Sequence, residues 1–529
     1  MRAPFLLDVS PQWLQRSAEG IVSRNGVVVA DCVVQAELGE AARLPDALVL
    51  DNIIEAVDQL RQGILWHIDQ QCAAAEDIQS DNTEDTRERQ LYAEVLVRVA
   101  VTGALASFYR AEAGSDNRKL LQLSKDRFAL GLLHVFEAFQ EVHSMKRGNY
   151  QQHRRGSSTI GTVGWDTLVL LHFVHRIPCA AREASAEVID EATGRIVRSW
   201  RKLLQSLQGA DPKDAPEHSR RRGALAVCNG LLSILFRRYN THQCRVIINS
   251  VEQSERVAAA GGEGGRLVIK PALHMTAEVL TFMYYKGRVM LYDRRLQEAH
   301  ASFQQAYHLL PPPGSGTDVQ QRNKQRVRFF LTVAGVANGR VVPEDIMQRD
   351  DLIAYIFRPM LAAAQRGDPC AFTSSVDSYG VLLRKRGVYF LLQHAKLMCF
   401  LVLVSRTFTA LGTFKGVDNT RIPLPVLTAV YVHIAKKGET LLEKSKVGEC
   451  SSAERPSAKE QRNKRPRGED GMDDSATITD DEMTWWVAKL ISTGLVRGYI
   501  SYEHKTVVVS RQNPFPTLAP ARDPNCEQR

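Results

Sequence analysis

The segment 479–509 constrains the fold most, because it places two strand patterns directly after a helix pattern. Thr479 and Glu482 have the spacing of a capping box, in which the two side chains satisfy backbone N–H groups at a helix start. Gly494 occupies the place where a glycine commonly ends such a helix. The runs RGYISYE and TVVVS predict two strands joined by a short turn at His504 and Lys505. A helix followed at once by a β-hairpin predicts a winged helix, with the hairpin as its wing.

Most of the remaining chain has the apolar spacing of helices. Apolar residues recur every three or four positions up to about residue 435, as on one face of an amphipathic helix. The predicted faces are Leu225, Cys228, Leu232, Leu235 and Tyr239 in one helix, and Met483, Trp486, Val487, Leu490 and Ile491 in the helix before the wing. A further helix is predicted from about Thr241 to Val257, and another starts near Asn323.

Residues 280–313 have the register of a tetratricopeptide-type helix pair. The matching positions are Gly287, Met290, Ala299, Phe303, Ala306 and Pro311. Small residues at Gly287 and Ala299 allow two antiparallel helices to approach closely, and Pro311 ends the second helix. No second copy matches as well, so the region predicts a solenoid of degenerate repeats in which each helix pair stacks on its neighbours.

Composition changes abruptly near residue 444. The stretch 444–478 is rich in charged residues and serine, with almost no large apolar side chain, and therefore predicts a disordered insertion. The predicted fold is an all-α helical solenoid of TPR-like helix pairs followed by a C-terminal winged helix with a small β-hairpin wing. Its predicted parts are an N-terminal helical region at 1–215, a TPR-like helical part at 216–400, a winged-helix part at 401–518 that contains the insertion, and a flexible tail at 519–529.

Composition and charge narrow the function only slightly. The 529 residues are 44% hydrophobic, which is enough to bury a substantial core, and the net charge of +9 permits nucleic-acid binding without requiring it. The nine cysteines are dispersed and form no CxxC pair, which predicts a reducing compartment. The N-terminal apolar run is interrupted by Asp8 and is too short for a signal peptide. The most apolar stretch, 387–404, contains Gln393, His394 and Lys396, and predicts a buried helix rather than a membrane span.

The common signatures of catalysis are absent from the sequence. It contains no GxxxxGK[ST], HExxH, GxSxG or GxGxxG pattern. His172 and His175 lie near one helix face with Cys179 close by, but two histidines without a matched second pair favour core or surface roles over a metal site. We therefore predict no catalytic residues, no metal, no cofactor and no small-molecule substrate.

Four basic residues surround the predicted wing, namely Lys489, Arg497, Lys505 and Arg511. Between Met483 and Leu518 only Glu503 opposes them. Cationic groups on the last helix and wing of a winged helix can contact phosphate oxygens, and the equally weighted alternative is an ordinary solvated face. Tyr499 is expected to point into the module, which leaves no aromatic platform, so binding is expected to tolerate different sequences and to weaken with salt.

A second basic cluster lies within the predicted insertion and comprises Lys459, Arg462, Lys464, Arg465 and Arg467. Its KRPR core is typical of a nuclear-import patch, because the segment is exposed and basic. The alternative is a solubilising charge block that the following acidic run balances.

Several blocks of this sequence resemble the PCI-domain-containing protein 2 family. The blocks are RRGALAVCNGLLSILFRRYN, YYKGRVMLYDRRLQEAHASFQQAYHLLP, NKQRVRFFLTVAGVANGRVVP and the ending LISTGLVRGYISYEHKTVVVSRQNPFPTL. The resemblance runs from about Arg220 to Leu518, interrupted by the insertion at 444–478, whereas residues 1–215 share only helical character with the family. The insertion departs from the family pattern and leaves open how the second and third helices of the winged helix connect.

The resemblance implies a non-enzymatic scaffold. Members of this family form the PCI subunit of the TREX-2 mRNA-export complex at the nuclear pore. There they pair through their winged helices with a larger PCI scaffold subunit, bind a small acidic subunit and present a basic surface to RNA or DNA. The same resemblance, together with the import patch, predicts a nuclear location, and the interpretation of 387–404 as a buried helix predicts no membrane partner. The alternative is a protein-only PCI scaffold of a signalosome or proteasome-lid type, which shares much of this architecture.

Overall fold

The computed structural model describes residues 8–43, 53–74, 83–113, 118–145, 164–208, 220–260, 274–312, 316–340, 342–414, 418–448 and 478–516. Two compact units are present, Met1–Val289 and Met290–Arg529, and the boundary between them falls inside a helix. Both units are helical, and the second ends in a small sheet, which confirms the predicted fold class. The predicted domain boundaries at 215 and 400 stay predictions.

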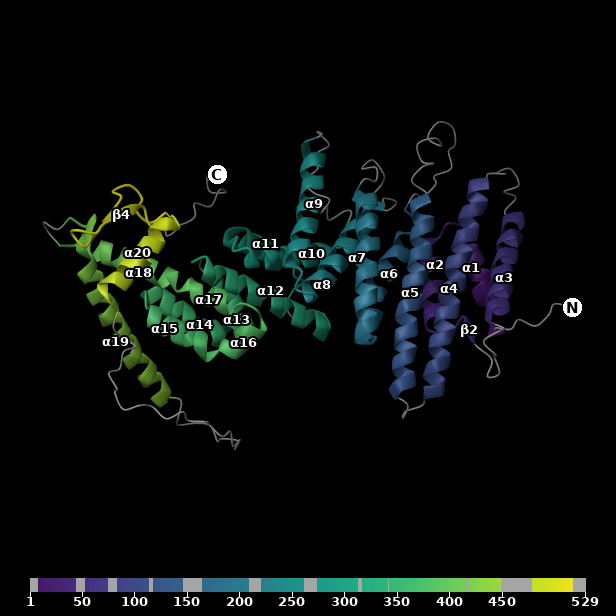
Figure 1. Cartoon of the computed structure of the whole chain (residues 1–529), viewed down its shortest axis with the longest axis horizontal. Helices are drawn as coiled ribbons and strands as arrows, with labels where there is room; N and C mark the ends of the chain where they lie inside the picture. Colours follow the sequence, from purple (N-terminus) through teal and green to yellow (C-terminus); the bar gives the residue numbers. More distant parts are fainter. Residues whose placement is uncertain are drawn as a thin grey trace. The chain divides into compact units, whose positions relative to one another are not determined.

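The first unit consists of helices and one short strand pair, in which β1 and β2 are antiparallel. Its elements are β1 Asp8–Val9, α1 Pro11–Val22, α2 Gly26–Glu37, β2 Ala42–Arg43, α3 Ile53–Ala74, α4 Thr83–Ala113, α5 Arg118–Met145, α6 Thr167–Glu183, α7 Ala186–Gln208, a 3-10 turn Arg220–Gly223, α8 Ala224–Arg237, α9 Thr241–Ala260 and most of α10 Thr276–Tyr292. Helices α4 and α5 run side by side in Figure 1 and pack extensively against each other. Phe136, Phe139, Phe173 and Trp200 form an aromatic cluster in its core.

A buried polar network joins distant segments of the first unit. Asp166 has no exposed surface and accepts a hydrogen bond of 2.6 Å from the Tyr92 hydroxyl. The Nδ1 atom of His143, also buried, lies 3.0 Å from the same carboxylate oxygen. Burial, followed by the charge of Asp166 and this hydrogen bond, raises the pKa of Tyr92 well above its usual value. The network ties α4 and α5 to the start of α6.

The second unit begins with the end of α10 and continues to the C-terminus. Its elements are α11 Leu296–His308, α12 Asp318–Ala337, α13 Glu344–Arg349, α14 Asp351–Arg366, α15 Pro369–Ser378, α16 Gly380–Lys385, α17 Tyr389–Ala395, α18 Leu397–Leu411, β3 Arg421–Pro423, α19 Leu424–Gly448, α20 Asp480–Ser492, β4 Gly498–Ser501 and β5 Thr506–Val509. Figure 1 shows α18, α19 and α20 gathered around β4, and the packing of α18 on α19 and α20 agrees with this view.

The winged helix consists of three helices and three strands, and β3 is the strand that joins the predicted hairpin to form its sheet. Its elements follow one another as α18, β3, α19, α20, β4 and β5, and the three strands form an antiparallel sheet in the order β3-β5-β4. The predicted capping box is confirmed, because the Glu482 amide donates to the Thr479 hydroxyl and the Glu482 carboxylate accepts from the Thr479 amide. Gly494 has a left-handed φ of 72°, as a C′ glycine should. The sequence analysis did not predict β3.

The inner face of this sheet covers the winged-helix core. Ile422, Val507 and Ile500 lie opposite one another on the three strands and face inward. Met483, Val487 and Leu490 of α20 and Phe400, Leu403 and Val404 of α18 complete the core. The apolar stretch 387–404 therefore supplies core residues, as predicted, although a turn at Lys396 divides it between α17 and α18. By length and composition alone, the stretches Thr86–Phe108 and Tyr389–Leu411 could each cross a membrane.

Three details differ from the sequence predictions. Tyr239 is 90% exposed with a φ of 56°, because α8 ends at Arg237 before that residue can join the apolar face. Helix α12 starts at Asp318 rather than near Asn323, because Thr317 forms a capping box with Gln320. Helix α19 continues to Gly448, so the helix reaches into the first residues of the predicted insertion. The remainder of the insertion, 449–477, lies outside the described residues.

Candidate nucleic-acid interface on the winged helix

The structure separates the four predicted wing residues into different places. Lys489 is exposed on α20, Arg497 directly precedes β4, Lys505 lies in the wing turn and Arg511 follows β5. The strand between Arg497 and the turn has four residues, so these two sites are separated by at least about 13 Å along the strand. The Arg497 carbonyl accepts from the Ser510 amide, which places Arg497 near Arg511 at the base of the wing. The four residues therefore do not form one continuous patch.

Arg511 has an acidic neighbour. Hydrogen bonds from Thr420, and then the charges of Arg511 and Arg421, lower the pKa of the Asp418 carboxyl. Among the described residues, by contrast, the side chains of Lys489, Arg497 and Lys505 have no ion-pair partner. Arg511 is thus the least available of the four for a phosphate, because Asp418 already offsets part of its charge.

The outer face of the sheet brings together residues that the sequence did not link. Arg421 of β3 and Tyr499 of β4 are both register partners of Val508 on the central strand β5. Strand alternation places Arg497 on the same face as Tyr499. Tyr499 is 63% exposed and the Arg421 side chain 74% exposed. We define this surface, formed by Arg421, Arg497 and Tyr499, as the outer sheet face.

The expectation that Tyr499 points into the module is wrong. Its neighbour Ile500 occupies the inward position opposite Val507, so alternation along β4 turns Tyr499 to the solvent. Tyr502 in the wing turn is also exposed, at 74%. The wing therefore presents the aromatic side chains that the sequence analysis did not expect, next to cationic ones.

Arg421 could not be predicted as a wing residue from the sequence, because β3 has only three residues and ends in Pro423. Such a run is too short to show the alternation by which a strand is recognised. Its partner β5 lies more than eighty positions further along the chain, so no local signal in the sequence connects the two strands.

Helix α20 is the third helix of the winged helix. Its N-terminal end is poorly suited to enter the groove of a nucleic-acid duplex, which is lined by phosphates. Its first turn contains Asp480, Asp481 and Glu482, which stabilise the helix N-terminus but repel phosphates. Lys489 is the basic residue of its last turn. The positive charge of the module is therefore found near the end of α20 and on the sheet, away from the start of that helix.

The residues of the predicted import patch, Lys459, Arg462, Lys464, Arg465 and Arg467, lie outside the described residues.

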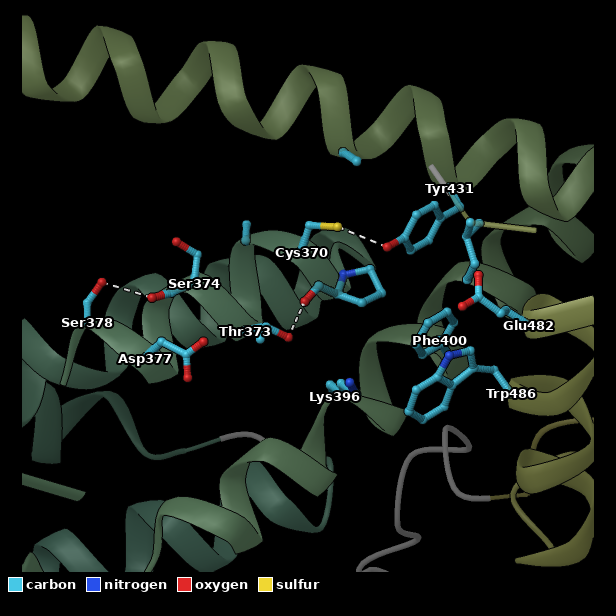
Figure 2. A pocket seen from close by; sticks show the side chains of 14 residues that line it. Cys370, Thr373, Ser374, Asp377, Ser378, Lys396, Phe400, Tyr431, Glu482 and Trp486 are labelled. Atoms are coloured by element: carbon cyan, nitrogen blue, oxygen red, sulfur yellow. Dashed lines mark hydrogen bonds between the residues drawn. The ribbon is translucent and has the colours of Figure 1, made fainter. Parts of the chain in front are cut away.

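A pocket of about 780 Å³ in the second unit is lined by residues of α15, α18, α19 and α20. Figure 2 shows Phe400 and Trp486 facing each other on one wall, and their rings stack with centroids 4.6 Å apart. Tyr431 of α19 stacks on the other side of Phe400, and the Nζ atom of Lys396 lies 4.8 Å from the centroid of Trp486. This stack links the three helices of the winged helix, because its rings come from α18, α19 and α20.

The polar groups of this pocket are engaged in structural bonds. The Tyr431 hydroxyl and the Cys370 thiol are 2.9 Å apart, and burial raises the pKa of Tyr431. The Asp377 carboxylate accepts from the Tyr389 hydroxyl and from the Gln393 amide. Glu482 belongs to the capping box. The two carboxylates of the lining, Asp377 and Glu482, are thus both held by hydrogen bonds within the protein.

His172, one of the two histidines of the predicted pair, lies on α6 where that helix meets α2. His172 lies 2.9 Å from a carboxylate oxygen of Glu37, whose other oxygen accepts from Arg176. Within the described ranges, no group of three or more His, Cys, Asp or Glu side chains is placed to hold a metal ion. His172 therefore serves a polar contact between α2 and α6.

Comparison with known proteins supports the resemblance seen in the sequence. PCI domain-containing protein 2 of Xenopus laevis is 21% identical over 346 residues, which cover 64% of this chain and 70% of that protein. The PCI domain-containing protein 2 homolog of Drosophila melanogaster is 23% identical over 310 residues, or 59% of this chain and 62% of that protein. Curated homologues of this chain thus carry the name suggested by its sequence blocks, and the resemblance is confirmed.

Other relatives have a different name. A Protein CSN12 homolog of Debaryomyces hansenii is 22% identical over 241 residues, covering 45% of this chain and 48% of that protein. No protein-family model matches the chain. Together, the relatives support a PCI-domain scaffold at the level of the family.

Proposed function

We propose that this chain, a homologue of the proteins named PCI domain-containing protein 2, is a non-enzymatic scaffold subunit of a TREX-2 type mRNA-export complex at the nuclear pore. In this proposal its winged helix pairs with a larger PCI scaffold subunit, and a small acidic subunit binds the same chain. The outer sheet face contributes to a surface that binds RNA or DNA. The single observation that supports nucleic-acid contact most is the exposed placement of Arg421, Arg497 and Tyr499 on one face of the wing sheet.

The chemistry of this face fits a single strand better than a specific duplex site. Arginine side chains contact phosphates whatever the base sequence, and an exposed tyrosine offers a ring on which any base can stack. The acidic first turn of α20 opposes its insertion into a duplex groove. Binding should therefore tolerate different sequences and weaken steeply with salt.

The test compares the wild-type chain with a variant in which Arg497, Lys505 and Arg511 are all changed to Glu. Fluorescence anisotropy with a short RNA and a short single-stranded DNA, at several salt concentrations, measures affinity and its salt dependence. The variant should lose most of the binding and stay folded, because all three side chains are exposed. Each lost phosphate contact should lower the slope of log affinity against log salt by about 0.7 for a single strand. Unchanged affinity would favour a solvated face and the protein-only scaffold.

The second candidate function is a protein-only PCI scaffold of a signalosome or proteasome-lid type. The observation that favours it is the group of relatives named Protein CSN12 homolog. Affinity purification of the tagged chain with identification of its partners separates the two candidates. An export scaffold together with pore proteins supports the first, and a deneddylase assembly supports the second.

We extend the proposal to a nuclear location through the basic residues Lys459, Arg462, Lys464, Arg465 and Arg467. A fluorescent fusion in which Lys464, Arg465 and Arg467 are changed to Ala should lose nuclear accumulation if import receptors recognise the patch. A matched variant with three acidic residues of the following run changed to Ala controls for altered charge in the segment. Equal nuclear signal in both variants would argue for a charge block, or for import together with a partner.

A further inference from the structure

A second groove lies on the second unit and includes one of the predicted wing residues. Its volume is about 570 Å³. Its lining comes from the turn before α11, the start of α11, the end of α12, α17, the start of α18, the end of α20 and the segment after α20. The aliphatic part of the lining is Leu296, Leu391, Leu397, Met398 and Leu495. Its polar part includes Arg294, Arg295, Glu298, His394 and Lys489. We call it the α11–α20 groove.

The charge of this groove is positive. Glu298 is the acidic residue among its lining residues, and Arg295 already binds that carboxylate through two nitrogens. Arg294 and Lys489 are exposed, and neither has an ion-pair partner within the part of the chain that the structure describes. Two uncompensated cations from separate helical segments therefore converge on one groove, an arrangement that favours an anionic ligand.

Arg294 is held in the groove by an unusual backbone conformation. Its φ is 59°, in the left-handed region that favours glycine, at the turn between α10 and α11. The amides of Leu296, Gln297 and Glu298 follow directly at the start of α11, whose N-cap Arg295 provides no capping hydrogen bond from its side chain. Helix N-termini of this kind add favourable N–H donors for a phosphate to the two cations already present.

An exposed aromatic residue, Phe390, lies on α17 one turn before a residue that lines the groove. His394, a lining residue, donates from Nδ1 to the carbonyl oxygen of Phe390 at 2.8 Å, so the two residues lie one turn apart on the same side of α17. Phe390 is 70% exposed. An exposed phenyl ring beside a cationic groove is suited to stacking a base while the backbone of the strand follows the charges.

The groove also continues toward the outer sheet face. Leu495 lines the groove, and Arg497 follows it by two residues, which limits the distance between their Cα atoms to about 7 Å. Tyr499 lies two residues further along β4. A single-stranded nucleic acid that leaves the groove near Leu495 would therefore contact Arg497 and Tyr499 next.

We infer that the α11–α20 groove binds the sugar-phosphate backbone of a single-stranded nucleic acid, with Arg294 and Lys489 on phosphates and Phe390 under a base. This inference rests on the proposed function, and it adds the groove to the wing surface as a second contact for the same nucleic-acid strand. The other anionic occupant, an acidic polypeptide, would use the same cations but would gain little from the exposed Phe390 ring.

The test uses the full-length chain and a fluorescent oligouridine in anisotropy titrations over a salt series. The groove variant combines Arg294→Gly with Lys489→Gln, because glycine fits the left-handed φ of Arg294 and removes its charge without strain. The matched control is Arg198→Gln with Lys202→Gln on α7, which removes the same charge from an exposed helix of the first unit. The third variant is Phe390→Ala. Thermal unfolding of each variant checks that it remains folded.

The groove variant should bind at least about tenfold more weakly than the control, and its salt slope should fall by about 1.4, for two lost phosphate contacts. Phe390→Ala should weaken binding by roughly fivefold or more without changing the slope, since stacking releases no counterions.

If wild type binds and the groove variant matches the control, the inference is overturned while the proposed function stands. If wild type does not bind at all, the nucleic-acid part of the proposed function fails and the inference with it. If the groove variant binds oligouridine like the control but loses binding to polyglutamate, the groove is a site for an acidic protein and the inference is overturned.

Discussion

Arg421 and Tyr499 lie on opposite edge strands of the wing sheet, and both are register partners of Val508 on the strand between them. The pairing sets a guanidinium and an exposed phenol on one face, with only an aliphatic side chain between. Neighbours across strands lie within reach of long and aromatic side chains. Under the proposed function, this relationship adds the outer sheet face to the wing tip as a surface for contact with a nucleic acid.

Changing Tyr499 to Ala should weaken binding to single-stranded RNA. The loss of one stacking platform corresponds to about 1–3 kcal/mol, or roughly fivefold to more than a hundredfold in affinity. Fluorescence anisotropy at one salt concentration measures the change. Tyr239→Ala is the matched control, because Tyr239 is an exposed tyrosine of the first unit. Equal affinity of both variants would exclude Tyr499 from the interface.

Changing Thr479 to Ala should destabilise the winged helix. The variant removes the hydroxyl that accepts from the Glu482 amide, and the loss of such a cap costs about 0.5–2 kcal/mol. Glu482→Gln is the control, since glutamine retains the reciprocal hydrogen bond of a capping box. Chemical denaturation is measured by tryptophan fluorescence, to which Trp485 and Trp486 of α20 contribute among the six tryptophans of the chain. A wild-type midpoint for Thr479→Ala would contradict a contribution of the cap to stability.

Changing Ala299 to Leu should overpack the second unit. Ala299 has no exposed surface, and α11 packs along α12, where Phe303 and Phe330 stack. A larger side chain at such a site costs about 1–3 kcal/mol. Ala301→Leu on the exposed face of the same helix is the control and should leave the melting temperature nearly unchanged. Gly287 and Ala299 are both buried, and their pairing in a close helix crossing stays a prediction.

The buried His300 should make the second unit less stable in mild acid. Burial, followed by the charge of Arg340, lowers the pKa of His300 from 6.5 to about 4. Between these values the unfolded chain binds a proton that the folded chain excludes, so stability is complete above the unfolded value and falls as the pH drops toward the folded one. The loss is at most about 1.4 kcal/mol per pH unit in this window.

Urea denaturation across the same pH window measures this effect. His300→Gln should flatten the dependence of the free energy of unfolding on pH relative to wild type. An unchanged pH dependence in the variant would show that other groups account for it.

The sequence predicted the elements whose causes are local. The capping box at Thr479 needs only the next three residues, and the C′ role of Gly494 needs only the helix before it. The alternation of RGYISYE and TVVVS defines a hairpin because the two strands are neighbours in the chain. The same locality explains the error at Tyr239, since its spacing continued the apolar face while the helix had already ended at Arg237.

The contacts that matter for a ligand depend on distant segments. Arg421 reaches the wing because β3 pairs with β5 across α19, the insertion and α20, and three residues carry too little pattern to predict that pairing. Lys489 was expected to share a surface with Lys505, yet it lines a groove with Arg294, almost two hundred positions earlier in the chain.

What the sequence determined by itself was the helical class of the chain, the winged-helix ending and the identity of most of the cationic residues available to a ligand. The apolar periodicity of a helix or strand is set by residues that are close in the chain. It can therefore be recognised from the sequence without knowing which segments pack against it. Only the tertiary structure decided which side chains share a surface. Packing turned Ile500 inward and therefore Tyr499 outward, and it set Lys489 beside the turn that holds Arg294. Which side of a strand or helix faces inward is determined by burial of its apolar side chains. That burial depends on the other segments that form the core.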